Sequence, residues 1–268
     1  MDILKKNLAP LTQKAWEAIN DEAKKMFHSL LSARRFVDIH GPKGIDYASV
    51  PLGILDMPEN NEKNEVKYGI HKVMPLVELR IPFTLNIWEL DNLERGAKNI
   101  NLDNLEKAAH KLSRFEEEAI YNGFNSAFIN GLINDSVHDP INYPDDVENL
   151  PKVVSQAMTI LSNSSVEGPY SLIVNNENWQ QISGIHKGYP LKRQLESLLG
   201  GSIIRNAFID SAFLVSERGG DFEMTIGQDI AIGYEHHDTK NVQLFFTESF
   251  TFRVLDDRAL VVFKPDAA

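Results

Sequence analysis

A serine, two carboxylates and a guanidinium lie close together in the second half of this sequence, and side chains of these types can carry out hydrolysis. They are Ser216, Glu217, Arg218 and Asp221. A serine nucleophile requires a nearby base, usually a histidine, to accept its proton. No histidine adjoins this group in the sequence, so we expect no hydrolase site here.

A second group, His236-His237-Asp238, contains side chains that bind metal ions. Successive residues of a strand point to opposite faces, so these three seldom converge on one ion. The chain also has no cysteine, which excludes disulfides, thiolate metal sites and cysteine nucleophiles. We therefore expect a solvated hairpin tip and no metal site.

A third group, Glu116-Glu117-Glu118, falls within a long segment of helical periodicity. At helical spacing Glu117 shares a face with Ser113 and Tyr121, and Arg114 lies one turn before Glu118. Two carboxylates that act as acid and base would need a second acidic partner, which the sequence does not locate. We expect these glutamates to form a solvated face.

Cofactor-binding motifs are absent from the sequence. It contains no G-x-G-x-x-G after a strand, no P-loop lysine and no G-x-S-x-G turn. The indole of Trp88 could stack a flat ligand such as a flavin, although packing in the core or against another subunit is the commoner role. We expect that the protein requires no cofactor.

Composition is that of an ordinary globular protein. The chain has 268 residues, 43% of them hydrophobic and 24% charged, and a net charge of −11. Nucleic acid is a poor partner for such a charge, because phosphate binding needs clustered Lys and Arg. The N-terminus lacks the apolar core of a signal peptide, and no stretch of about 18 apolar residues occurs. We expect a cytoplasmic protein that does not bind a membrane.

The hydrophobic pattern predicts helices first and strands later. Residues 12–35 are expected to form an amphipathic helix with Thr12 as its N-cap, and residues 101–123 a longer one with Asp103 and Glu106 as a capping box. The Gly219-Gly220 pair predicts a tight hairpin with positive φ angles. Further helices are predicted at 144–163 and 191–199, an extended hairpin between 37 and 87, and strands at 171–174, 212–216, 222–226, 230–234, 242–252 and 260–263.

Seven segments in order along the chain resemble one protein family. They are PLTQKAWEAI, RRFVDIHGP, MPLVELRIPFTLNIWELDNLERG, EGPYSLIVN, YPLKRQLE, VSERGGDFEMTIGQDIAIGYE and FFTESFTFRVL. With compatible spacing from about Leu4 to Phe263, the sequence resembles the encapsulins, the linocin-like shell proteins of bacterial and archaeal nanocompartments.

This resemblance implies an α+β fold of the HK97 capsid type, with a long spine helix. It implies an N-terminal arm and helix at 1–48 that packs with the P-domain, and an E-loop at 49–81 that lies on a neighbouring subunit. The P-domain with the spine helix would follow at 82–134 and the A-domain at 135–225, after which 226–268 would return to the P-domain.

The implied function is structural. Many copies would close into an icosahedral shell around cargo enzymes, such as ferritin-like iron-storage proteins or peroxidases, and the shell protein itself would not be an enzyme. A C-terminal targeting peptide of the cargo would bind on the luminal face. Carried over by position, the residues that would bind it are Phe27, Leu30, Leu31, Arg34, Asp38, Ile230, Ile232 and Phe250.

The resemblance also implies a five-fold pore lined by Ile185, His186, Lys187, Gly188 and Tyr189. Symmetry would repeat His186 into a ring that makes the pore charge pH-dependent near neutrality. Two other functions stay open at this point: a phage-type major capsid protein of the same fold and, less favoured, a hydrolase or bacteriocin.

Overall fold

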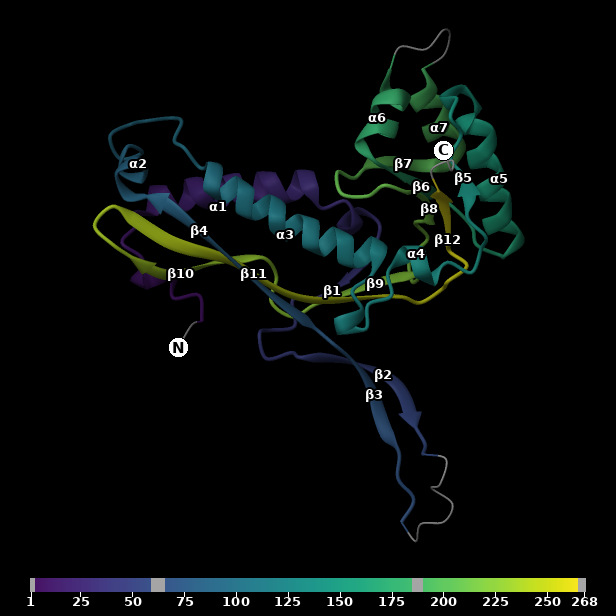
Figure 1. The fold of residues 1–268 in the computed structure, drawn as a ribbon, viewed down its shortest axis with the longest axis horizontal. Coiled ribbons are helices and arrows are strands. Elements are labelled where there is room, and N and C mark those ends of the chain that lie inside the picture. Colours follow the sequence, from purple (N-terminus) through teal and green to yellow (C-terminus); the bar gives the residue numbers. More distant parts are fainter. Residues whose placement is uncertain (1–2, 59–65, 185–189, 265–268) are drawn as a thin grey trace.

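The computed structural model describes residues 3–58, 66–184 and 190–264. Figure 1 shows three parts: a long twisted sheet covered by helices, a second sheet packed with its own helices, and a two-stranded arm that projects from the body. This combination of helices and sheets confirms the predicted α+β class.

The first sheet is built around one long strand, β11 (Asn241–Val254). β4 (Val77–Asn86) pairs antiparallel with it, as do β10 (Ala231–His237) and β9 (Phe222–Ile226). β1 (Asp38–His40) then adds to β9 in parallel. Residues 244–252 of β11 are all buried, because the strand has neighbours on its edges and is covered on its faces.

Two long helices cover this sheet, and both have the apolar stripe that the sequence predicts. α1 (Gln13–Leu30) and α3 (Asp103–Asn122) pack against each other, and α3 also contacts β4. The buried hydrophobic residues of the two helices are Ala15, Ile19, Ala23, Phe27, Leu105, Ala108, Ala109, Leu112, Ala119, Ile120 and Tyr121.

The helix ends agree only in part with the prediction. Thr12 is the N-cap of α1, since its hydroxyl accepts a hydrogen bond from the Ala15 N–H at 3.2 Å. The expected capping box of α3 is wrong: its N-cap is Leu102, and the Asp103 N–H donates instead to the side chain of Asn101. α1 ends at Leu30 rather than near Arg35, because the chain becomes extended at Leu31.

The second sheet has the order β5-β12-β8-β6-β7. Its strands are β5 (Ile141–Asn142), β6 (Tyr170–Val174), β7 (Gly200–Arg205), β8 (Ala212–Ser216) and β12 (Leu260–Lys264). The helices packed with it are α5 (Leu150–Asn163), α6 (Asn176–Ser183) and α7 (Leu191–Leu199) (Figure 1). α5 starts later than predicted, because residues 147–149 form a separate 3₁₀ turn.

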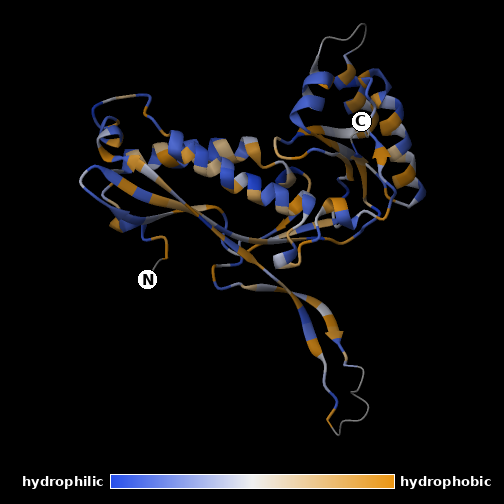
Figure 2. Cartoon of the chain, in the orientation of Figure 1, coloured by the Kyte–Doolittle hydropathy of each residue, from blue (hydrophilic) through white to orange (hydrophobic). Residues whose placement is uncertain are grey.

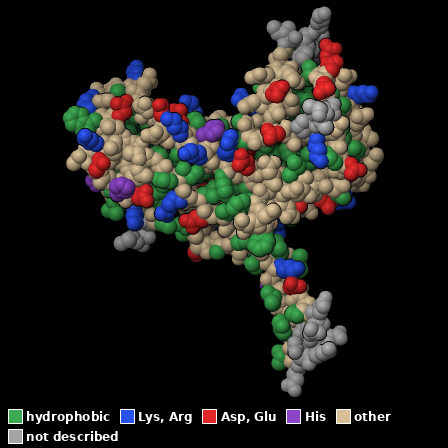
Figure 3. Space-filling view, viewed as in Figure 1, with side chains coloured by type: hydrophobic (Ala, Val, Ile, Leu, Met, Phe, Trp, Pro, Cys, Tyr) green, Lys and Arg blue, Asp and Glu red, His purple; other side chains and the backbone are tan. Residues whose placement is uncertain are grey.

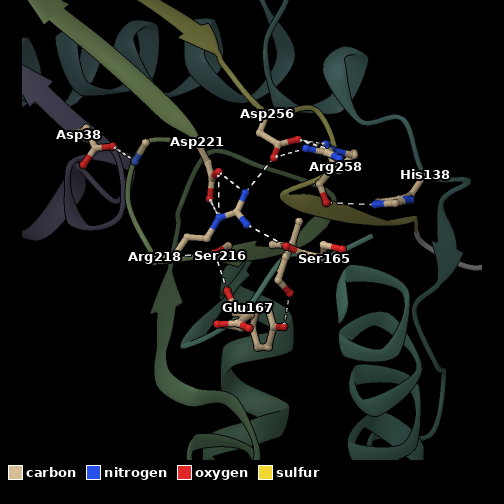
Figure 4. Close-up of polar contacts among 12 residues, drawn as sticks. Asp38, His138, Ser165, Glu167, Ser216, Arg218, Asp221, Asp256 and Arg258 are labelled. Carbon is tan, nitrogen blue, oxygen red and sulfur yellow. Dashed lines mark hydrogen bonds and ion pairs between the residues drawn. The ribbon is translucent and has the colours of Figure 1, made fainter. Parts of the chain in front are cut away.

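The predicted hairpin at Gly219-Gly220 is wrong, although both glycines have positive φ angles of 83° and 81°. The strands on either side do not pair with each other: β8 belongs to the second sheet and β9 to the first. The glycines instead lie in a linker between the sheets. Figure 4 shows Arg218 of this linker between Asp221 and Asp256, with Nη2 2.8 Å from a carboxylate oxygen of each.

Two strands depart from the domain division that the resemblance implies. Four of the five residues of β9 lie within the segment 135–225 assigned to the A-domain, yet the strand pairs in the first sheet. β12 lies within the segment 226–268 assigned to the P-domain, yet it pairs with β8 and β5 in the second sheet. The chain therefore passes between the sheets once more than predicted.

The arm is formed by β2 (Ser49–Asp56) and β3 (Ile70–Pro75), which pair antiparallel. Figure 2 shows hydrophobic residues along both strands although the arm stands away from the body. The remaining short elements are α2 (Ile87–Asp91), α4 (Leu132–Asp135) and 3₁₀ turns at Lys6–Leu8, Ala33–Arg35, Asn125–Ala127 and Val147–Asn149. In the described residues, no helix has both the length and the apolar character needed to cross a membrane.

Candidate functional site

A pocket of about 460 Å³ lies between α1 and the start of β10. Its apolar lining includes Phe27, whose ring meets Phe246 of β11 edge to face at 5.1 Å between centroids. Charged side chains from both sides surround this apolar surface. The lining residues are Asn20, Lys24, Phe27, His28, Leu31, Arg34, Arg35, Asp229 and Ile230.

The residues that the resemblance assigns to peptide binding separate into two sets. Phe27, Leu31, Arg34 and Ile230 line this pocket together. Leu30, Asp38, Ile232 and Phe250 do not line it: Phe250 and Ile232 are buried in the core, and Leu30 is half-buried at the end of α1. Asp38 accepts a hydrogen bond from the Gly220 N–H at 2.6 Å and so contacts the linker between the sheets.

Arg34 joins the pocket to a buried group of carboxylates. Its Nε and Nη2 donate to the two oxygens of Glu116 at 2.8 Å each, which is a bidentate contact. Nη1 donates to Asp229 at 2.9 Å, and Nη2 also donates to Glu248 of β11. Glu116 and Glu248 are fully buried, and Asp229 is half-exposed at the pocket.

The charges in this cluster depend on one another. Burial alone would lower the pKa of Arg34, but the carboxylates of Glu116 and Glu248 raise it above its ordinary value. Burial raises the pKa of Glu248 well above its ordinary range and the charge of Glu116 raises it further, whereas Arg34 lowers it. Arg34 is therefore cationic at neutral pH, and the balance of these effects leaves the pKa of Glu248 well above its ordinary value.

The expectation that Glu116, Glu117 and Glu118 form a solvated face is wrong for the first two. Glu116 and Glu117 have no exposed surface. Only Glu118 is exposed, and it lies 3.7 Å from Arg114 as the spacing predicts. The second acidic partner that the sequence does not locate is Glu248. Its only sequence signal is a charged residue inside the otherwise apolar and hydroxyl-bearing run 244–252.

The Ser216 group does not have the geometry of a hydrolase. The Ser216 hydroxyl donates to the backbone oxygen of Glu167 at 3.0 Å and accepts from the Arg218 N–H. His138 lies in the same region of Figure 4, but its Nε2 contacts the backbone oxygen of Arg258 at 3.0 Å. Within the described ranges, the hydrogen-bond partners of this serine are backbone groups, and none is a base.

The His236-His237-Asp238 group lies at the exposed end of the β10–β11 hairpin: the two histidines end β10 and Asp238 begins the turn. Asp238 accepts hydrogen bonds from the backbone N–H groups of Lys240 and Asn241, which closes the turn. His237 contacts the hydroxyl of Tyr234 at 2.6 Å. In the part of the chain that the structure describes, no three His, Asp or Glu side chains are placed to hold a metal ion.

Two further predicted sites have less structural context. Trp88 lies in α2 and is 69% exposed, so its indole face is accessible to a flat ligand. The predicted pore residues Ile185, His186, Lys187, Gly188 and Tyr189 lie outside the described residues. Flavin stacking and the pore both stay predictions.

Solved structures with the same arrangement of elements are shell-forming particles. A virus-like particle from Pyrococcus furiosus matches with a TM-score of 0.66 at 19% identity, over 94% of this chain and 98% of the other. The capsid of Myoviridae phage XM1 matches with a TM-score of 0.57 at 14% identity, over 88% and 92%. The fold is therefore the HK97-type capsid fold.

Sequence comparison narrows this class to one family. A family model described as "Encapsulating protein for peroxidase" matches residues 1–251. A "Type 1 encapsulin shell protein" of Rhodococcus erythropolis is 38% identical over 262 residues, which cover 97% of this chain and 99% of the relative. The chain belongs to the encapsulin family.

Proposed function

We propose that copies of this chain assemble into a closed icosahedral shell that encloses a cargo enzyme in the cytoplasm. The observation that carries this proposal is the arm. It exposes apolar side chains, including Ile54, Leu55, Ile70 and Val73, and the exposed fraction of Ile70 is 61%. A two-stranded hairpin is marginal in water without a surface to pack on, which supports the proposal that another copy of the chain covers it.

A second apolar surface lies where the arm joins the body (Figure 3). There a groove of about 700 Å³ includes Phe128, Val137 and Leu255, and Phe128 is 71% exposed. Exposed apolar surfaces at two places on one molecule suit repeated contacts between identical copies, which close when the rotation between neighbours is that of a point group.

We also propose that the pocket of Phe27, Leu31 and Ile230 binds a C-terminal peptide of the cargo on the luminal face. The apolar lining suits aliphatic anchors of a peptide, and Asp229 at the pocket would pair with a basic residue of it. The family description names a peroxidase as the enclosed protein, and a ferritin-like iron-storage protein is the other candidate. Catalysis then belongs to the cargo, and the shell protein needs no cofactor.

The phage-capsid alternative has weaker support. The phage similarity is at 14% identity and reflects the fold alone, whereas the 38% identical relative is a shell protein of the encapsulin type. The hydrolase alternative lacks a base at Ser216.

Shell assembly is tested by electron microscopy and light scattering of the purified full chain. We expect hollow particles of uniform size. A variant with Ile70→Glu and Val73→Glu should stay folded by circular dichroism but form no particles, because it places charges at the arm's exposed apolar positions. Lys72→Gln, an exposed polar position on the same strand, should assemble normally. A monodisperse wild-type monomer would contradict the proposal.

Peptide binding is tested separately, with a fluorescent reporter that carries a C-terminal tail of Gly, Leu and basic residues. Ile230→Ala should weaken reporter binding to the assembled shell about tenfold, because it removes buried apolar surface worth roughly 1.5 kcal/mol. Ile39→Ala is the matched control, since Ile39 is exposed and does not line the pocket. Equal affinities for the two variants would show that the peptide binds elsewhere, even if shells form.

A further inference from the structure

Glu117 is a fully buried carboxyl in the middle of α3 that the proposed shell and cargo functions do not use. Its Oε1 accepts a hydrogen bond from the Ala33 N–H at 3.1 Å. Its Oε2 accepts from the Ser32 hydroxyl and from the side-chain amide of Asn206, the latter at 2.6 Å. Three donors therefore point at one carboxyl group that has no contact with water.

These donors come from different parts of the fold. Ser32 and Ala33 belong to the segment that follows α1. Asn206 comes directly after β7, and it is fixed there because its N–H donates to Val174 of β6 at 2.9 Å and its side-chain oxygen accepts from Phe208 at 2.6 Å. Glu117 thus joins the N-terminal segment, α3 and the second sheet at one point.

Aromatic rings surround this junction. The ring of Tyr121 lies 5.2 Å from Phe213 of β8 and 6.3 Å from Phe36 of the N-terminal segment. Phe36 in turn meets Phe222 of β9 edge to face at 5.7 Å. The junction is apolar apart from the polar network itself, so a charge on Glu117 is not solvated.

Glu117 has no cation as a partner within the described residues. Arg34, next to Ala33, is directed to Glu116, Asp229 and Glu248 instead. The titratable neighbours are Glu116 and Tyr121 on α3 itself and Arg35 of the N-terminal segment, which acts on Tyr121. From the second sheet the facing group is the neutral Asn206.

Burial and hydrogen bonding act on this carboxyl in opposite directions. The pKa of Glu117 is raised to about 8: burial raises it most, the hydrogen bonds from Ser32 and Ala33 oppose this rise, and the charge of Glu116 adds to it. With Glu117 ionised, the Tyr121 hydroxyl can donate to Ser32, 2.8 Å away, while Ser32 donates to Glu117. With Glu117 protonated, its own hydroxyl can donate to Ser32, and the hydrogen bonds among Glu117, Ser32 and Tyr121 reverse their direction.

We propose that Glu117 is a proton-dependent lock that holds the N-terminal segment, α3 and the second sheet together and weakens when the carboxyl loses its proton. The direction follows from linkage. When the junction opens, water reaches the carboxyl and its pKa returns toward the ordinary value of 4.5, below the value of about 8 in the closed form. The closed form therefore binds the proton more tightly, and its stability is lost as the pH rises through this interval.

The interval between the pKa values of Glu117 in the open and closed forms also sets how far the junction opens as the pH rises. Between about pH 5 and pH 8 the ratio of open to closed junction should rise by up to about tenfold per pH unit, and it should become constant above pH 8. Because the donors lie on the second sheet as well as on the N-terminal segment, the opening should loosen the attachment of that sheet to α3.

The test compares the full-length wild type with Glu117→Gln from pH 5 to pH 9, by thermal unfolding and by amide hydrogen exchange corrected for its intrinsic pH dependence. The wild type should lose thermal stability as the pH rises, and residues 31–36 and 200–206 should exchange faster. Glu117→Gln should show a flatter profile. Glu118→Gln, one position away but exposed, should follow the wild type.

Light scattering at each pH measures the oligomeric state, and the variants are compared only where this state is the same. The result therefore does not depend on whether shells form. Identical pH profiles for Glu117→Gln and the wild type would overturn the proposal. If Glu117→Gln does not fold, Ser32→Ala serves instead. It removes a hydrogen bond that lowers the pKa of Glu117, so the transition should move to higher pH, and an unmoved transition would also overturn the proposal.

Discussion

Replacement of Arg34 by alanine is expected to lower the free energy of unfolding by about 3–5 kcal/mol. The physical reason is that Arg34 is the shared cation of two fully buried carboxyl groups, Glu116 and Glu248. Without it, Glu116 loses a bidentate contact and retains an uncompensated charge inside the protein. Burying such a charge costs more than a lost surface ion pair.

Denaturant unfolding measures this loss. The protein concentration is held fixed because any assembly would also contribute to stability. Arg35→Ala is the matched control: it removes the same side chain one position along, where the arginine is exposed and donates to the backbone oxygen of His28 at 3.1 Å. The stability of Arg34→Lys should fall between those of the two alanine variants, since lysine keeps the charge but cannot make the bidentate contact with Glu116. Equal stabilities of the two alanine variants would show that the cluster does not need its cation.

The same variants separate two roles of Arg34. The family resemblance assigns it to binding a cargo peptide, whereas its donors here already face Glu116, Asp229 and Glu248. Asp229 is the half-exposed member of this group. If the role of Arg34 is purely structural, Arg34→Ala should therefore lower stability without altering which reporter tail binds.

Local patterns were sufficient to predict much of the fold. The helix at 191–199 and the strands at 212–216 and 222–226 have the predicted bounds. Each has an apolar pattern, periodic or continuous, with a glycine or polar residue at its end, and such signals depend only on neighbours in sequence. The N-cap at Thr12 was predictable for the same reason.

The buried carboxylates could not be predicted in this way. Arg34 and Glu116 are 82 positions apart, and their pairing depends on how α1 and α3 pack. Three successive glutamates on a helix usually face water, so the local rule gave the wrong burial for Glu116 and Glu117. The tertiary fold brings Arg34 and Asn206 to this part of α3, where their contacts offset the cost of burying Glu116 and Glu117.

The linker at Gly219-Gly220 also has one feature that the local sequence predicts and one that depends on the tertiary fold. The positive φ angles follow from glycine alone, but the choice of strand partner does not. β9 pairs with β11 and β1 in the first sheet, and β8 pairs with β12 and β6 in the second. A short connection between two strands therefore predicts a turn but not a hairpin.

A pair of glycines at the end of α3 should be as sensitive as Arg34. Gly123 and Gly131 have φ angles of 93° and 81° with ψ angles near 160°, a region that is essentially restricted to glycine. Their backbones are also in contact: a Cβ on Gly123 would lie 2.2 Å from the oxygen of Asn130, and one on Gly131 would lie 2.3 Å from the nitrogen of Gly123. No side-chain movement can relieve either clash.

Gly123→Ala and Gly131→Ala are each expected to lower the free energy of unfolding by about 3–5 kcal/mol, from backbone strain and steric overlap together. Gly96→Ala is the matched control, because Gly96 has a φ of 96° but no atom within 4 Å of its Cβ position. It should lose only the strain, about 1–2 kcal/mol. Denaturant unfolding of the three variants compares these losses, and equal values would show that the backbone contact contributes nothing.

The location of this pair gives the loss a structural consequence beyond stability. The backbones of Phe124 and Ile129 pair between the two glycines, and the chain then continues toward the second sheet. The loop between them presents the exposed side chain of Phe128, itself at a positive φ of 58°. A shift of this loop would move Phe128 at the groove beside the arm, so alanine at either glycine should impair particle formation even under conditions where the chain stays folded, whereas Gly96→Ala should not.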